Sequence, residues 1–99
     1  MEAYNVVRFK VKASQEKAFI DFHKKAQAID GMLDGVMIKT GDRSYCFIAR
    51  WGSFDKIVAA RPNMIAMLDG IRGMLEDLGN GLGVTDPVSG EVVLELAHA

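Results

Sequence analysis

The stretch Ser44-Tyr45-Cys46-Phe47-Ile48-Ala49-Arg50-Trp51 decides the fold of this chain of 99 residues. It reads as a β-strand with mostly apolar residues on both faces, because strand side chains alternate. One face carries Tyr45, Phe47, Ala49 and Trp51, and the other carries Cys46, Ile48 and Arg50. A strand of a small antiparallel sheet usually has one dry face and one wet face. This strand is therefore expected to need cover on both.

The residues before this strand predict a strand, a helix and the first arm of a hairpin. Residues 6–12 alternate between apolar and basic side chains, which is typical of an amphipathic strand. Ser14 fits an N-cap for an amphipathic helix over residues 15–29, which Asp30-Gly31 would end. Residues 35–40 then form a short strand, and the turn at 41–43 returns the chain antiparallel.

The residues after this strand predict a broken helix and a last strand. Ser53 is the expected N-cap of a helix that Arg61-Pro62 interrupts, and Asn63 can cap its restart. An apolar stripe of helical period then runs from residue 64 to 78, with Gly79 as its C-cap. Residues 85–90 are dense in turn formers, and residues 91–96 alternate like a strand.

The element order is therefore β-α-β-β-α-β, in one α+β domain over residues 1–99. The economical arrangement is a ferredoxin-like four-stranded antiparallel sheet in the order 4-1-3-2, with both helices on one face. Residues 44–51 then lie in the middle of the sheet. Two helices cover only one face, so we expect a second copy of the protein to cover the other, with the Tyr45–Trp51 parity toward the helices.

Composition excludes several classes of function. The net charge of −1 argues against nucleic acid as a partner, and no apolar run approaches the roughly 20 residues that span a bilayer. The first residues do not resemble a signal peptide, and the single cysteine favours a reducing, cytoplasmic setting. There is no metal-ligand spacing, phosphate loop or dinucleotide fingerprint, so we expect no metal and no cofactor.

The order of elements and several local signatures resemble the dimeric α+β-barrel superfamily, and more narrowly the antibiotic-biosynthesis-monooxygenase-like proteins. The residues that carry this resemblance are the opening strand 4–11, the central strand ending Ala49-Arg50-Trp51, the Gly52-Ser53-Phe54-Asp55 start of the second helix, and the closing segment 85–93. Together they span nearly the whole chain.

The resemblance implies a homodimer whose two sheets pack face to face, and a ligand pocket between sheet and helices in each subunit. Relatives include cofactor-free oxygenases of phenolic substrates and haem-degrading enzymes. The haem-degrading branch uses an asparagine on the first strand, a tryptophan near the end of the third and a histidine on the second helix. Asn5 and Trp51 match the first two, but no histidine occurs between residues 53 and 78.

Several residues are candidates for a site, each with a structural alternative. Asn5 could bind a carbonyl or hydroxyl and Trp51 could form an aromatic wall; both could equally serve packing. His23, at the edge of a helical apolar stripe, could be a general base or a partly exposed flank residue. Tyr45, Phe47, Met64 and Met67 are expected to line a pocket or the core. Arg50 is expected to orient a ligand or to pair with an acid of the partner subunit.

The sequence thus predicts a homodimer that binds a small, planar, apolar molecule between helices and sheet. If the protein is an enzyme, the expected reaction is cofactor-independent oxygenation with His23 as base. The alternative is a non-catalytic dimeric module that binds ligands or other partners.

Overall fold

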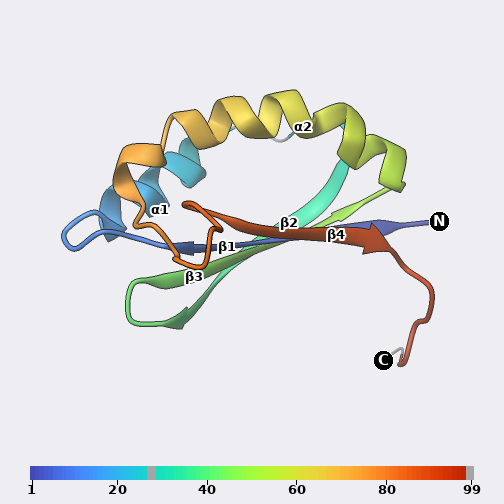
Figure 1. The fold of residues 1–99 in the computed structure, drawn as a ribbon. Helices are drawn as coiled ribbons and strands as arrows, with labels where there is room; N and C mark the ends of the chain where they lie inside the picture. The colour runs from blue at the N-terminus through green and yellow to red at the C-terminus, as the bar shows by residue number, and fades with distance from the viewer. Residues whose placement is uncertain (27–28, 98–99) are drawn as a thin grey trace.

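A computed structural model, which describes residues 1–26 and 29–97, contains one four-stranded antiparallel sheet with both α-helices on one side (Figure 1). The elements are β1 (Ala3–Lys10), α1 (Glu16–Lys25), β2 (Met32–Gly41), β3 (Ser44–Trp51), α2 (Phe54–Asp69), a 3-10 turn (Arg72–Met74) and β4 (Asp86–Glu91). The strand order β2-β3-β1-β4 is the predicted one. The ferredoxin-like α+β fold is confirmed.

The strand Ser44–Trp51 lies at the centre of the sheet, as the sequence predicts. It pairs with β1, where Val7 is opposite Phe47, and with β2, where Met37 is opposite the same residue. Tyr45, Ala49 and Trp51 are buried beneath the helices, which confirms the predicted parity.

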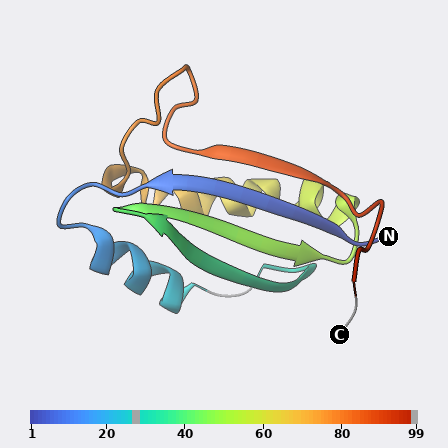
Figure 2. The ribbon, with the colours of Figure 1, turned by 90° about the horizontal axis from the view of Figure 1, so that it is seen from below.

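The opposite face of the sheet has no covering layer within residues 1–26 and 29–97 (Figure 2). Its apolar side chains come from all four strands, with Arg50 at one end. We call this surface the open face and define it by Tyr4, Val6, Val36, Ile38, Cys46, Ile48 and Val88. Tyr4, Val36, Ile38 and Val88 are exposed.

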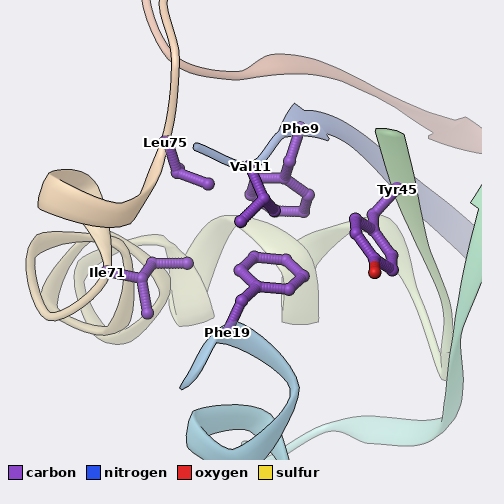
Figure 3. Packing of buried hydrophobic residues seen from close by; sticks show 6 residues of the cluster. All are labelled: Phe9, Val11, Phe19, Tyr45, Ile71 and Leu75. Atoms are coloured by element: carbon purple, nitrogen blue, oxygen red, sulfur yellow. The ribbon is translucent and has the colours of Figure 1, made fainter. Parts of the chain in front are cut away.

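The core lies between the helices and the sheet and has two centres. In one, Phe19 of α1 lies between Phe9 and Tyr45 of the sheet, and Ile71 and Leu75 close it from the segment after α2 (Figure 3). The ring centroids of Phe9 and Phe19 are 5.5 Å apart, and those of Phe19 and Tyr45 are 5.2 Å apart. The other centre gathers around Trp51 and Ile57.

Helix α1 differs from its prediction at both ends. Ser14 has a φ of 70° in a turn, so Gln15 takes the N-cap position without a side-chain hydrogen bond. The helix ends at Lys25, since Ala26 is extended, and not near residue 30. The predicted helix also covered residues 27 and 28, which lie outside the described residues.

The predicted break at Arg61-Pro62 is wrong, because α2 runs without interruption from Phe54 to Asp69. Pro62 lies on the exposed side of the helix, where water can bind the carbonyl that the missing N–H leaves unpaired. Asn63 therefore caps nothing. The predicted Ser53 N-cap is confirmed, since its hydroxyl accepts a hydrogen bond from the Lys56 N–H.

The long helix predicted up to residue 78 is also wrong. Helix α2 ends before Gly70, where an added Cβ would lie 3.1 Å from the Phe22 ring. The chain then turns through Arg72–Met74 and brings Ile71 and Leu75 onto Phe19. Gly79 has a φ of 81° but lies in a loop, so it is no helix cap.

The last strand lies earlier in the chain than the sequence predicts. Strand β4 (Asp86–Glu91) falls mainly within the predicted turn formers of residues 85–90, and residues 92–97, which include most of the predicted strand 91–96, are outside the sheet. As an edge strand, β4 tolerates Pro87, which has no N–H to donate. Val93 and Leu96 are 89% and 88% exposed. We call residues 92–97 the tail.

Neither helix in the described part of the chain has the length and hydrophobicity needed to cross a membrane.

Candidate functional site

A cavity of about 950 Å³ lies between the sheet and the two helices. Its floor comes from the helix-facing side chains of all four strands, among them Asn5, Met37, Phe47 and Pro87. Its roof comes from α2 and its side from α1. Most of its surface is apolar, as expected for a site that binds an apolar small molecule.

The buried polar pair of this cavity is Asn5 and Trp51. The indole N–H of Trp51 donates to Asn5 Oδ1 at 2.7 Å. Because an indole nitrogen can only donate, this contact fixes the orientation of the amide. Asn5 Nδ2 then lies 3.8 Å from the Met64 sulfur. Asn5 thus offers the cavity an N–H donor, with a thioether as its only competing acceptor in the described chain.

His23 reaches the cavity from the last turn of α1. Its Nδ1 lies 2.8 Å from the Phe19 carbonyl oxygen, and its ring packs on the Phe19 ring with centroids 4.6 Å apart. A carbonyl oxygen accepts only, so Nδ1 carries the proton in this contact. In the neutral ring, Nε2 is then the proton acceptor.

Six of the eight residues predicted for the site line this cavity. They are His23, Asn5, Phe47, Trp51, Met64 and Met67. Their convergence follows from the predicted strand parity and from the continuous α2, which presents both methionines to the sheet.

The other two predicted site residues, Tyr45 and Arg50, do not line the cavity. The Tyr45 hydroxyl donates to Glu16, whose carboxylate also binds Lys39 at 2.9 Å. The hydrogen bond between Tyr45 and Glu16 raises the pKa of the phenol and, with Lys39, lowers the pKa of the carboxyl group. Tyr45 is thereby committed to a contact within the protein.

Arg50 lies on the opposite side of the sheet from the cavity. It pairs with two acids of its own chain: Nη2 is 2.7 Å from Asp34, and Nη1 is 2.8 Å from Glu2. These hydrogen bonds raise the pKa of the Arg50 guanidinium, and the bond to Asp34 makes the largest contribution. These ion pairs lie within one chain, whereas the sequence-based alternative expected acids of the partner subunit.

The sequence analysis missed two cations of the lining, Lys24 of α1 and Arg61 of α2. Arg61 was assigned to a helix break, so its helical spacing from other residues was not considered. It lies four residues after Ile57 and four before Ile65, and both of these residues also line the cavity. A continuous helix through Pro62 would have placed all three on neighbouring turns of one side. Among the described residues, no three or more His, Cys, Asp or Glu side chains lie close enough together to hold a metal ion.

Comparison with solved structures shows which fold this is. SnoaB, a cofactor-independent oxygenase from Streptomyces nogalater, superposes with a TM-score of 0.68 at 19% identity, with 98% of each chain covered. A protein assigned to the antibiotic biosynthesis monooxygenases from Chloroflexus aurantiacus gives 0.71 at 13% identity, again over 98% of each chain. The chain has the fold of the antibiotic biosynthesis monooxygenase-like proteins.

This monooxygenase-like fold also occurs in a protein of unknown function from Nitrosomonas europaea, with a TM-score of 0.72 at 19% identity, over 99% of this chain and 95% of that one. No protein-family model matches the sequence, and the curated proteins contain no match to it. At these identities the likeness establishes the fold, and a fold alone does not select an activity.

Proposed function

We propose that this protein binds a small, planar, largely apolar molecule in the cavity and oxygenates it without a cofactor. The observation that carries the proposal is the convergence of Asn5, Trp51 and His23 in an otherwise apolar cavity. A few polar groups in an apolar pocket fix the orientation of a ligand. The fold shared with a cofactor-independent oxygenase supports the same reaction class.

His23 has the properties of a general base in this reaction. Its Nδ1–H is held by the Phe19 carbonyl, so Nε2 can accept a proton from an acidic C–H or O–H group of the substrate. The Asn5 N–H can donate to the oxygen on which the resulting negative charge is shared. The apolar walls exclude water from the anion.

The carbanion then reacts with dioxygen directly. One electron passes from carbon to oxygen, and the radical pair combines into a peroxide anion that takes back the proton held by His23. Loss of water from this hydroperoxide breaks the O–O bond and leaves a ketone. In sum, a CH₂ group and O₂ give a C=O group and H₂O, so no external reductant is needed.

The second candidate function is a dimeric binding module without catalysis. One observation favours it: among the described residues, His23 is the only lining side chain suited to proton transfer near neutral pH. Ligand binding is common to both candidates, and only the rate of oxygenation separates them.

We propose further that the working form is a homodimer built through the open face. The chain exposes 6549 Å². A monomeric protein of this mass exposes roughly 5,500 Å². The excess of about 1,000 Å² is close to the roughly 800 Å² that each partner of a stable complex buries. Val36, Ile38 and Val88 supply exposed apolar surface of the kind that such an interface covers.

The tail supports the same assembly. It leaves β4 and runs to the open side of the sheet, away from the helices (Figure 1). Three of its apolar residues, Val93, Leu94 and Leu96, are exposed in a single chain. A second copy seated on the open face would give them a surface to pack on.

Oxygen consumption with an anthrone, a planar tricyclic ketone with an acidic CH₂ group, tests the catalytic proposal. The wild-type protein should accelerate O₂ uptake and quinone formation, and His23→Gln should reduce kcat by about 100-fold or more, because it removes the base. Lys25→Gln, a change two residues away that is outside the cavity lining, is the control. Anthrone binding without faster oxygenation would instead establish the non-catalytic module.

A further inference from the structure

The charged residues of the cavity lining are all cations. Lys24 comes from α1, where it follows His23, and Arg61 comes from α2. No Asp or Glu of the described chain lines the cavity. The whole chain carries a net charge of −1. The basic character of the cavity is therefore a local property, and it is not a consequence of a basic protein surface.

Both cations are available to a ligand. No salt bridge engages Lys24 or Arg61 within the part of the chain that the structure describes. The nearest acid on the helix of Lys24, Asp21, is held by Lys17 at 2.7 Å. The Arg61 guanidinium lies 5.8 Å from the centroid of the Phe54 ring, a contact that leaves its N–H groups free to donate.

Both side chains are exposed, whereas the polar pair Asn5–Trp51 is buried. The cavity thus has an apolar body with an amide donor inside and cations at its solvent side. A ligand that matches this arrangement has a planar apolar body and one anionic group at the end nearest to solvent. An uncharged ligand would leave both cations unused.

We propose that the ligand of this cavity is an aromatic acid, whose carboxylate or comparable anion is bound by Lys24 and Arg61. The inference rests on the proposed binding of a planar apolar molecule and adds its charge. Arg61 can bind a carboxylate through two parallel N–H groups, and Lys24 contributes a point charge from α1.

Two fluorescent dyes of the same ring system test this inference. 1-Anilinonaphthalene-8-sulfonate carries one anion, and N-phenyl-1-naphthylamine lacks it. We expect the wild-type protein to bind the anionic dye more tightly. Lys24→Gln with Arg61→Gln should weaken binding of the anionic dye about tenfold and leave the neutral dye unchanged, because two partly solvated charge contacts are removed.

The control is Lys25→Gln with Arg72→Gln, which removes the same number of charges outside the lining, one from α1 and one from the turn after α2, where Arg72 pairs with Asp69 at 3.1 Å. It should leave the affinity for both dyes unchanged. High salt should weaken only the anionic dye, which tests the charge contacts in the wild-type protein without any substitution.

The outcomes separate this inference from the proposed function. If both dyes bind equally well and the lining variant affects neither, the charge preference is wrong and the apolar binding site stands. If neither dye binds, the proposed binding function fails as well. If the control variant weakens the anionic dye as much as the lining variant does, the effect comes from net charge and the assignment to Lys24 and Arg61 is wrong.

Discussion

Val36→Glu combined with Ile38→Glu should convert the proposed homodimer into a monomer. Both side chains are exposed on the open face, where β2 pairs with β3. Val36 is opposite Ile48, and Ile38 is opposite Cys46. In a dimer through this face, the variant would place four carboxylates where the wild-type interface has apolar side chains. Burial of unpaired charge costs several kcal/mol for each ion, which is comparable with the whole binding energy of a micromolar dimer.

Sedimentation velocity at micromolar concentration measures this effect directly. The wild-type protein should sediment with twice the mass of the 10.8 kDa chain, and the double variant with one. Val58→Glu is the matched control, because Val58 is 42% exposed on α2 and Ile38 is 44% exposed on the sheet. A double variant that stays dimeric would move the interface away from the open face.

Phe19→Ala should lower the free energy of unfolding by about 3–5 kcal/mol. Phe19 is fully buried and is the central ring of the cluster that joins α1 to the sheet (Figure 3). Its contacts with Phe9, Tyr45 and His23 would all be lost, and the surrounding backbone cannot collapse onto the space. The loss is a large share of the roughly 5–15 kcal/mol that stabilises a domain.

Urea unfolding followed by circular dichroism measures this loss. Wild type and variant are compared at one protein concentration, because dimerisation would make stability depend on concentration. Val58→Ala, on the exposed side of α2, should change stability by less than about 0.5 kcal/mol. A Phe19→Ala protein within 1 kcal/mol or so of wild type would show that α1 is not anchored through this ring.

The centre of the sheet could be predicted from the sequence, because Ser44–Trp51 is apolar on both faces, as a strand between two neighbours can be, and the turn at 41–43 fixes one of those neighbours. The edge strand β4 could not be predicted in the same way. Pro87 and Gly90 are turn formers by local preference, yet β4 pairs with β1 through Val88 opposite Val6. Strand pairing at an edge depends on the partner strand, and the propensities of these residues do not contain that information.

The helix break at Pro62 was a second local rule that the tertiary structure overrode. Ile57, Ala60 and Met64 pack under α2 on both sides of the proline, and their burial offsets one lost hydrogen bond. The error had a consequence for the site. With the helix interrupted, Arg61 had no defined direction, so the cation that now lines the cavity could not be found.

The candidate site could be predicted where it depended on strand parity. Asn5, Phe47 and Trp51 follow from the alternation of β1 and β3. The fine geometry could not be predicted, since the Asn5–Trp51 hydrogen bond needs the register that places Asn5 opposite Ala49, two residues from Trp51. The face of Arg50 followed from the same alternation, but its ion pairs could not be predicted, because Glu2 and Asp34 are distant in sequence and meet Arg50 only across the folded sheet.

The proposed function requires that the cavity beneath α2 bind a planar apolar molecule. An NMR titration with N-phenyl-1-naphthylamine tests it most directly. The predicted result is a saturable shift of the Trp51 indole N–H, the Asn5 amide and the methyl groups of Met64 and Met67, with no shift of the Ile38 methyl groups on the open face. Shifts confined to Ile38 and its neighbours, or no saturable shift at all, would contradict it.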